Sequence, residues 1–341
     1  MTTVLTPAET AAPAKPPTPV TMAAALNAAL ADSLAADDRV VVFGEDVGTL
    51  GGVFRVTDGL ASRFGEQRVF DTPLAEAGIV GTAIGMAMNG LVPVVEMQFD
   101  AFAYPAFEQV TSHLAKLRNR TRGRLALPVV IRVPFGGGIG AVEHHSESPE
   151  TLFAHVPGLK VISCGDPVDA YWMIQQAIES DDPVVFFEPK RRYHEKAELD
   201  ESVPPALPLH KAKVVREGTD ATLLCYGPMV KTCLQAAEAA VEDGRNLEVV
   251  DLRTIAPFDL ATIFASVRKT RRAVVVHEAP YSFGPGSEIA ARVTEECFYH
   301  LEAPVLRVTG YDTPYPPSRM EDDYLPDLDR VLDGVDRVMG Y

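Results

Sequence analysis

The chain has 341 residues, 47% of them hydrophobic, so it is long enough to bury the cores of two ordinary domains. Its 47 acidic residues outnumber its 31 basic ones, and the net charge of −16 disfavours a nucleic acid as partner. Such a surface would suit a basic protein module, or it serves only to keep the protein in solution.

Helix and strand patterns alternate along most of the chain, which indicates an α/β fold. Residues 1–19 are rich in Ala, Pro and Thr, and their prolines predict a disordered arm. The run VVVF at 40–43 is continuously apolar, which is typical of a strand buried on both faces. The first domain, at 20–200, is then expected to hold a helix from 21, this strand, a helix at 75–89, a strand at 92–97, a helix at 105–118, strands at 128–133 and 158–163, a helix at 168–180 and a strand at 183–188.

A charged, proline-rich stretch predicts a linker at 201–212, followed by a second domain at 213–341. The prolines of the tail DTPYPPSRMEDDYLP predict an ordered surface arm, not a packed element. The alternation indicates parallel sheets with crossover helices in both domains. Before the tail we expect a strand at 221–227, a helix to about 243, strands at 247–253 and 273–279, a helix at 286–300 and a strand at 304–310.

The segment FGGGIGA at 135–141 has the glycine spacing of a dinucleotide-binding loop. Such a loop must open a helix, and here the polar, turn-like EHHSESPE follows. The same argument disfavours a non-catalytic nucleotide-binding scaffold, which would need a helix directly after Gly140. We instead expect a pliable loop that presents His144 and His145. Two adjacent histidines in an extended chain cannot both face one site, so one is a candidate catalytic residue and the other orients it or faces solvent.

Carboxylates at two places are further candidates. Glu76 lies one turn into a helix of small and apolar residues, where burial would suit proton sharing, although it could simply complement the helix dipole. Glu45 and Asp46 follow the strand at 40–43, at the edge where α/β sheets bind ligands, or they form an ordinary turn.

The strand at 92–97 leads into a segment that contains Gln98, Phe102 and Tyr104. These residues would lie at the same edge of the sheet, where an aromatic ring could stack on a planar heterocycle. Aromatic residues in such a position also commonly fill the core.

The cysteines and the N-terminus predict a cytoplasmic protein. The four cysteines form no C-x-x-C pair and lie in apolar or helical surroundings, as in proteins of a reducing compartment. No apolar run has the roughly 18 residues of a membrane span, and the N-terminus lacks the regions of a signal peptide. We therefore expect neither export nor membrane attachment.

Eight ordered motifs resemble the β subunit of the decarboxylating component of 2-oxo acid dehydrogenases: GEDVG, GGVFRVTDGL, FDTPLAEAGIVGTAIGMA, EMQFDAF, HHSESPE, PGLKVIS, DPVVFFEPK and DTPYP. The resemblance runs from about 21 to 341. Within the family, FEPKRRY and TGYDTPYP are more similar to the branched-chain (3-methyl-2-oxobutanoate) enzymes than to the pyruvate enzymes. The resemblance implies a thiamine-diphosphate-binding parallel-sheet domain followed by a transketolase C-terminal-like α/β domain.

The resemblance also implies partners. In the family an α subunit supplies the G-D-G motif that holds Mg²⁺ and the diphosphate, and this chain has no such motif; the nearest text is GDP at 165–167. We expect an α2β2 heterotetramer that is active only as a pair. It would oxidatively decarboxylate branched-chain 2-oxo acids and transfer the acyl group to the lipoyl arm of an acyltransferase core, whose basic domain would suit the acidic surface. A pyruvate-specific enzyme is the first alternative.

The resemblance assigns roles to individual residues. Glu76 matches the carboxylate that bonds N1′ of the aminopyrimidine, and His145 matches the histidine that orients intermediates and helps transfer the acyl group. The cofactor-binding positions are Glu45, Leu74, Ala75, Glu76, Gln98 and Phe102, and the substrate positions are Phe102, Ala103, Tyr104, Pro105 and His145. Relatives hold a structural K⁺ largely through backbone carbonyls, and the matching positions are Leu127, Val129, Val130, Ala177, Ser180 and Asp182.

Overall fold

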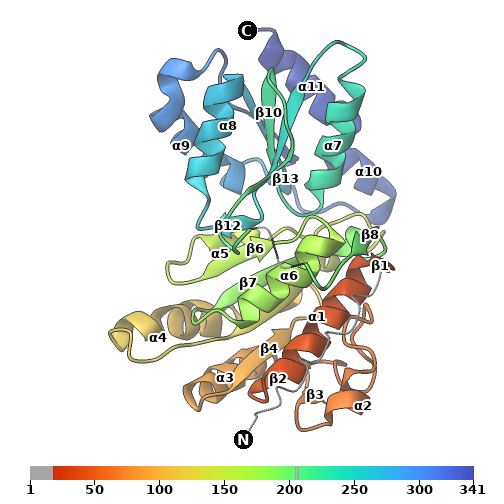
Figure 1. The fold of residues 1–341 in the computed structure, drawn as a ribbon, viewed down its shortest axis with the longest axis vertical. Coiled ribbons are helices and arrows are strands. Elements are labelled where there is room, and N and C mark those ends of the chain that lie inside the picture. The colour runs from red at the N-terminus through yellow and green to blue at the C-terminus, as the bar shows by residue number, and fades with distance from the viewer. Residues whose placement is uncertain (1–17, 204, 206) are drawn as a thin grey trace, which may run out of the picture.

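The computed structural model contains two α/β domains stacked along its long axis (Figure 1). It describes residues 18–203, 205 and 207–341. Most of the expected disordered arm, residues 1–17, lies outside these. Its last two residues were predicted wrongly, because they belong to β1 (Thr18–Thr21), which pairs antiparallel with β8 (Lys196–Leu199).

A seven-stranded sheet in the order β12-β6-β7-β5-β4-β2-β3 forms the N-terminal domain. Six of its strands are parallel, and β12, which comes from later in the chain, pairs antiparallel with β6 at one edge. The strands are β2 (Val40–Gly44), β3 (Val69–Asp71), β4 (Val92–Glu96), β5 (Val130–Phe135), β6 (Lys160–Ser163), β7 (Val184–Pro189) and β12 (Thr254–Ala256).

Both faces of this sheet are buried, as the continuous apolar runs predicted. In β2, Val41 and Phe43 join the core under α3 (Glu76–Met88), whereas Val40 and Val42 pack against α1 (Met22–Ala36) and α6 (Pro167–Ile178). Alternate residues point to opposite faces of a strand, so a run without polar residues needs a helical layer on each side. Figure 1 shows α1 and α6 side by side on one face.

The segment after β4 is less regular than the single helix expected at 105–118. It consists of a 3₁₀ turn η1 (Ala101–Ala103), a π-helical stretch η2 (Gln109–Leu114) and the short helix α4 (Ala115–Arg120). Such wide turns are frequent at functional sites. Other short elements of this domain are α2 (Leu60–Phe64), η3 (Glu143–His145), α5 (Glu150–Ala154) and η4 (Lys190–Arg192).

The C-terminal domain has a five-stranded sheet in the order β14-β13-β10-β11-β9, parallel except for the edge strand β9. Strand β8 ends and β9 begins on either side of the proposed linker at 201–212. The elements of this domain are β9 (Lys213–Arg216), β10 (Ala221–Cys225), α7 (Met229–Ala239), β11 (Leu247–Asp251), α8 (Leu260–Thr270), β13 (Ala273–Pro280), α9 (Pro285–Cys297), η5 (Phe298–His300) and β14 (Leu306–Gly310).

The tail at 312–326 is packed only in part: Tyr315, Glu321, Tyr324 and Leu325 are buried, and there the prediction of a surface arm was wrong. It forms η6 (Ser318–Met320) and α10 (Glu321–Tyr324), and α11 (Leu328–Met339), for which no element was predicted, follows it. The prolines stop at Pro326, and the sequence beyond it places Val331, Val335 and Val338 on one helical face. These three valines are fully buried in the core of the C-terminal domain.

Two further observations concern the helices and the cysteines. Among the helices of the described residues, none has the length and apolar character that crossing a membrane requires. All four cysteines are free and buried.

Candidate functional site

The carboxyl ends of parallel strands bring most of the predicted site residues to one edge of the N-terminal sheet. Glu45 follows β2, Gln98 follows β4, and the glycine loop that leads to His145 follows β5. Glu76 begins α3, directly after Leu74 and Ala75 in the loop that follows β3. This edge is where open α/β sheets bind their ligands.

Glu45 is the residue whose environment most clearly calls for a ligand. It is 5% exposed, and neither of its carboxylate oxygens meets the geometry of a hydrogen bond within the described residues. Burial, then the charges of Glu76 and Asp46, raise the pKa of Glu45 to about 6, and the nearby amide of Ala75 offsets this only in part. Glu76 is itself 9% exposed. Two neighbouring buried carboxylates suit a ligand that donates hydrogen bonds or carries a proton, as an aminopyrimidine does.

Asp46, which follows Glu45 in the sequence, forms a turn, as one of the two interpretations of this pair predicted. Its backbone is in the left-handed region, with φ 59°. Its Oδ2 accepts a hydrogen bond of 2.8 Å from Nε2 of Gln98, which ties the ends of β2 and β4 together. Leu74 is 77% exposed at the same edge, so its side chain can contact a ligand or a partner.

Aromatic rings surround His145. Its ring centroid lies 4.0 Å from that of Phe99 and 5.2 Å from that of Phe102, and the ring of His144 is 4.4 Å away. His144 is exposed, whereas His145 is half-buried with its Nδ1 unpartnered in the described structure. Burial, then the charges of His144 and Lys190, lower the pKa of His145. A neutral imidazole at pH 7 is able to accept a proton.

A buried ion pair behind these rings was not predicted. Asp100 bonds Nζ of Lys190, and neither side chain is exposed. The second oxygen of Asp100 accepts the amide of Ala101 at 2.9 Å, which fixes the turn that carries Phe102. Burial raises the pKa of Asp100 to about 7, and Lys190 opposes this rise. A lysine directly after the strand in FEPKRRY was the available signal, but only the fold reveals its partner.

The remaining substrate positions divide into two kinds. The Tyr104 hydroxyl donates to the carboxylate of Glu147, which ties the Phe102 turn to the histidine loop. Burial, then this bond, raise the pKa of Tyr104 well above its usual value. Pro105 is exposed, whereas Ala103 is 2% exposed and packs in the core.

A cavity of about 330 Å³ lies between the two domains, and Ser146, which follows His145 in the sequence, lines it. The N-terminal domain contributes Tyr104 and Glu147 to its wall, and the C-terminal domain contributes Glu278, Phe283 and Tyr315. Of the predicted site residues, Tyr104 lines this cavity, whereas Glu45, Glu76, Phe102 and His145 do not.

Of the six expected K⁺ positions, Ser180 and Asp182 have polar side chains, and both are paired. Leu127 donates its amide to the carbonyl of Asp181 at 3.0 Å, which joins the two segments. Nζ of Lys160 lies 2.9 Å from Oγ of Ser180 and 3.1 Å from a carboxylate oxygen of Asp182, which also bonds Arg118. An ammonium and a guanidinium group balance this carboxylate, so an ion here would depend on backbone carbonyls, as the resemblance implies. The other expected positions are Val129, Val130 and Ala177.

Comparison with known proteins identifies both domains. Residues 18–196 match the transketolase pyrimidine-binding domain, and residues 210–331 match the transketolase C-terminal domain. A solved structure described as a split gene transketolase, inactive beta4 tetramer, has a TM-score of 0.79 at 22% identity, over 94% of this chain and 98% of its own. The predicted fold class is thereby confirmed.

Two curated relatives give the family. The pyruvate dehydrogenase E1 component subunit beta of Leifsonia xyli subsp. xyli is 59% identical over 94% of this chain and 95% of its own length. The 3-methyl-2-oxobutanoate dehydrogenase subunit beta of Mycobacterium tuberculosis is 56% identical over 94% of this chain and 92% of its own. The chain belongs to the β subunits of the E1 component of 2-oxo acid dehydrogenases.

Proposed function

We propose that this chain is the β half of an α2β2, thiamine-diphosphate-dependent 3-methyl-2-oxobutanoate dehydrogenase. The enzyme would oxidatively decarboxylate branched-chain 2-oxo acids and transfer the acyl group to a lipoyl arm. The buried, unpartnered carboxylate of Glu45 beside Glu76 supports a cofactor that carries a proton. The motif FEPKRRY favours the branched-chain type. Pyruvate is the second candidate substrate, because the relative at 59% identity is named a pyruvate dehydrogenase subunit.

The chain's own residues would hold the cofactor and move protons. A bound thiamine diphosphate would supply the nucleophilic carbon that makes decarboxylation possible. Glu76 would hold a proton at N1′ of the aminopyrimidine, and Phe102 would pack against that ring. Glu45, Leu74, Ala75 and Gln98 would border it. His145, neutral at pH 7, would accept or return a proton during acyl transfer.

The α subunit would complete the site. This chain contains no G-D-G motif to hold Mg²⁺ and a diphosphate. A structural K⁺ enters the proposal only through the family resemblance, since Lys160 and Arg118 already pair with the side chains at its expected place. The buried, free cysteines support a cytoplasmic location.

The proposal predicts activity only in the assembled pair. We expect the chain co-expressed with an α subunit to decarboxylate 3-methyl-2-oxobutanoate faster than pyruvate, with thiamine diphosphate and Mg²⁺ present. The lone chain should decarboxylate neither acid. Release of CO₂ from each acid measures both outcomes. Activity of the lone chain would contradict the shared site, and a faster rate on pyruvate would move the enzyme to the second candidate.

The acidic surface predicts a salt-dependent complex with a lipoyl acyltransferase core. The net charge of −16 would attract a basic subunit-binding domain, and salt screens such attraction. We expect the Kd for that domain to rise steadily between about 50 and 500 mM NaCl, where the screening length falls severalfold. Titration calorimetry at several salt concentrations measures this. A Kd independent of salt would remove the electrostatic explanation.

A further inference from the structure

The glycine loop at 136–140 binds carboxylates of the C-terminal domain through its backbone. Gly136, Gly138 and Gly140 all have positive φ, at 82°, 86° and 70°. The amide of Gly137 donates to Oε2 of Glu278 at 3.0 Å. The amides of Gly138 and Gly140 donate to the two carboxylate oxygens of Glu321, each at 2.9 Å. A concave row of amides of this kind is an anion site, and here the anions belong to the protein.

The glycines are required by this close approach of the two domains. A Cβ atom at Gly137 would lie 2.0 Å from the Tyr315 hydroxyl, and one at Gly136 would lie 2.7 Å from Oε2 of Glu278. The dinucleotide-like spacing therefore has a different explanation from phosphate binding. It lets the loop fit against the C-terminal domain.

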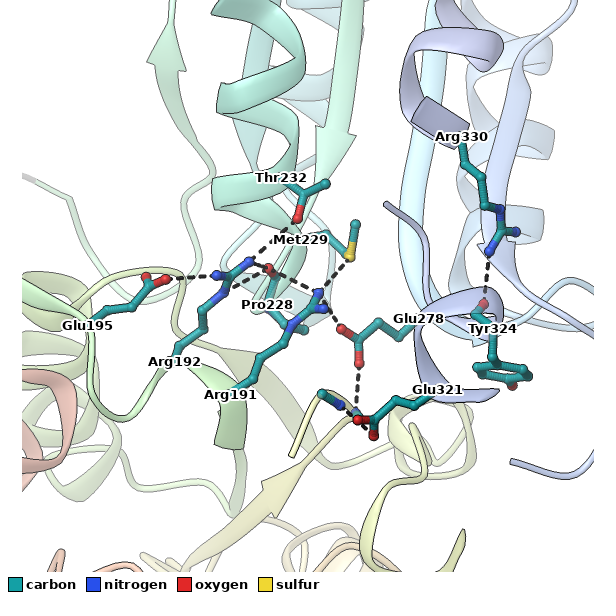
Figure 2. Close-up of polar contacts among 12 residues, drawn as sticks. Arg191, Arg192, Glu195, Pro228, Met229, Thr232, Glu278, Glu321, Tyr324 and Arg330 are labelled. Atoms are coloured by element: carbon teal, nitrogen blue, oxygen red, sulfur yellow. Dashed lines mark hydrogen bonds and ion pairs between the residues drawn. The ribbon is translucent and has the colours of Figure 1, made fainter. Parts of the chain in front are cut away.

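Both carboxylates are held in place from several sides. Glu278 is 3% exposed and forms an ion pair of 2.5 Å with Nη2 of Arg191. Figure 2 shows Arg191 reaching from the N-terminal domain to this carboxylate and to Met229 at the start of α7. Glu321 is 6% exposed and accepts a hydrogen bond of 2.6 Å from Tyr315. These bonds fix the position of the amides that the two acids accept.

The loop held in this way carries the candidate catalytic histidine. Only four residues separate Gly140 from His145, whose amide bonds the carbonyl of Val142 at 3.0 Å. The far side of the loop returns to its start, because the amide of Gly136 donates to the carbonyl of Glu147 at 2.9 Å. A shift of the glycine segment must therefore move His145.

We propose that Glu321 is a positioning residue, which holds the glycine loop so that His145 lies in the position that acyl transfer requires. The inference rests on the proposed function for the role of His145, but the contacts themselves do not. Glu321 acts through the loop and does not reach the aromatic cluster around His145. Its loss should affect transfer of the acyl group more than decarboxylation.

The test compares Glu321→Gln with Asp322→Asn in the co-expressed complex. Gln keeps the size of Glu but has one acceptor oxygen for two amides, whereas Asp322 is exposed on the same short helix and serves as the control. We expect hydrogen exchange in residues 137–147 to be about tenfold faster in Glu321→Gln. Acyl transfer to a lipoyl domain should fall about tenfold, while decarboxylation with ferricyanide as acceptor should stay within about twofold. Asp322→Asn should match the wild type in all three measurements.

Each contrary result has a distinct meaning. Unchanged hydrogen exchange in Glu321→Gln would overturn the contact. Faster hydrogen exchange with an unchanged ratio of acyl transfer to decarboxylation would overturn the positioning role. A wild type that neither decarboxylates nor transfers would contradict the proposed function, and hydrogen exchange would still test the contact. Should Glu321→Gln fail to assemble, Tyr315→Phe removes one donor to Glu321 and should cause a smaller change in the same direction.

Discussion

Replacing Glu76 with Gln is expected to lower kcat of the assembled enzyme by about 10²- to 10⁴-fold, the range of a lost proton-transfer group. Gln is nearly isosteric with Glu, so the start of α3 and the assembly of the complex should be unchanged. An amide cannot exchange a proton with N1′ of the aminopyrimidine in the way a carboxylate can. Steady-state rates on 3-methyl-2-oxobutanoate with saturating thiamine diphosphate measure the effect.

The control for this prediction is Glu66→Gln, because Glu66 is exposed on the same domain and away from the strand ends that build the site. It should retain the wild-type rate. The pKa of Glu45 provides a second readout, since the charge of Glu76 is one cause of its rise to about 6. In Glu76→Gln this pKa should fall toward the ordinary value. Near-normal turnover in Glu76→Gln would refute the role assigned to Glu76.

Local sequence patterns predicted the central strands because the apolar residues of each strand are consecutive in the sequence. The run at 40–43 specifies burial on both faces by itself, and the structure confirms it. Two features, α11 and β12, were not predicted, for different reasons. Prolines in the tail concealed the helical spacing of α11, which starts beyond them. Strand β12 consists of three residues whose pairing with β6 depends on how the two domains meet, and no local pattern encodes that.

The same distinction separates the parts of the site. Residues that follow strand ends, such as Glu45 and Gln98, could be predicted, because parallel strands bring their carboxyl ends together. The Asp100–Lys190 pair joins residues 90 positions apart, and the bonds from Glu321 reach amides more than 180 positions away. Each member looks like an ordinary surface charge in the sequence. Only the tertiary fold shows that these charges are buried and which partners they have.

Arg132→Met is expected to cost about 3–5 kcal/mol of folding free energy, the range for removing one partner from a buried ion pair. Arg132 lies in the middle of the sheet and is 0% exposed. Its guanidinium bonds both carboxylate oxygens of Glu188, at 2.6 and 2.9 Å, and Oε2 of Glu96 at 2.5 Å. Met fills a similar volume but leaves both acids buried without a counter-charge. Urea unfolding of the β chain, followed by the fluorescence of its single tryptophan, measures the loss.

The pH dependence separates this electrostatic cost from lost packing. Burial raises the pKa of Glu96, and Arg132 opposes that rise. Without Arg132 the pKa of Glu96 in the folded protein should rise further. The ionised carboxylate then destabilises the fold above that pKa, and this cost disappears as the pH falls and Glu96 takes up a proton. The loss of folding free energy in Arg132→Met should therefore be smaller at pH 5 than at pH 8.

The triple variant R132M/E96Q/E188Q should regain part of the lost stability at pH 8. Arg292→Met removes an exposed arginine and should cost less than about 0.5 kcal/mol. A deficit that is equal at both pH values would mean that lost packing, and not uncompensated charge, destabilises the variant.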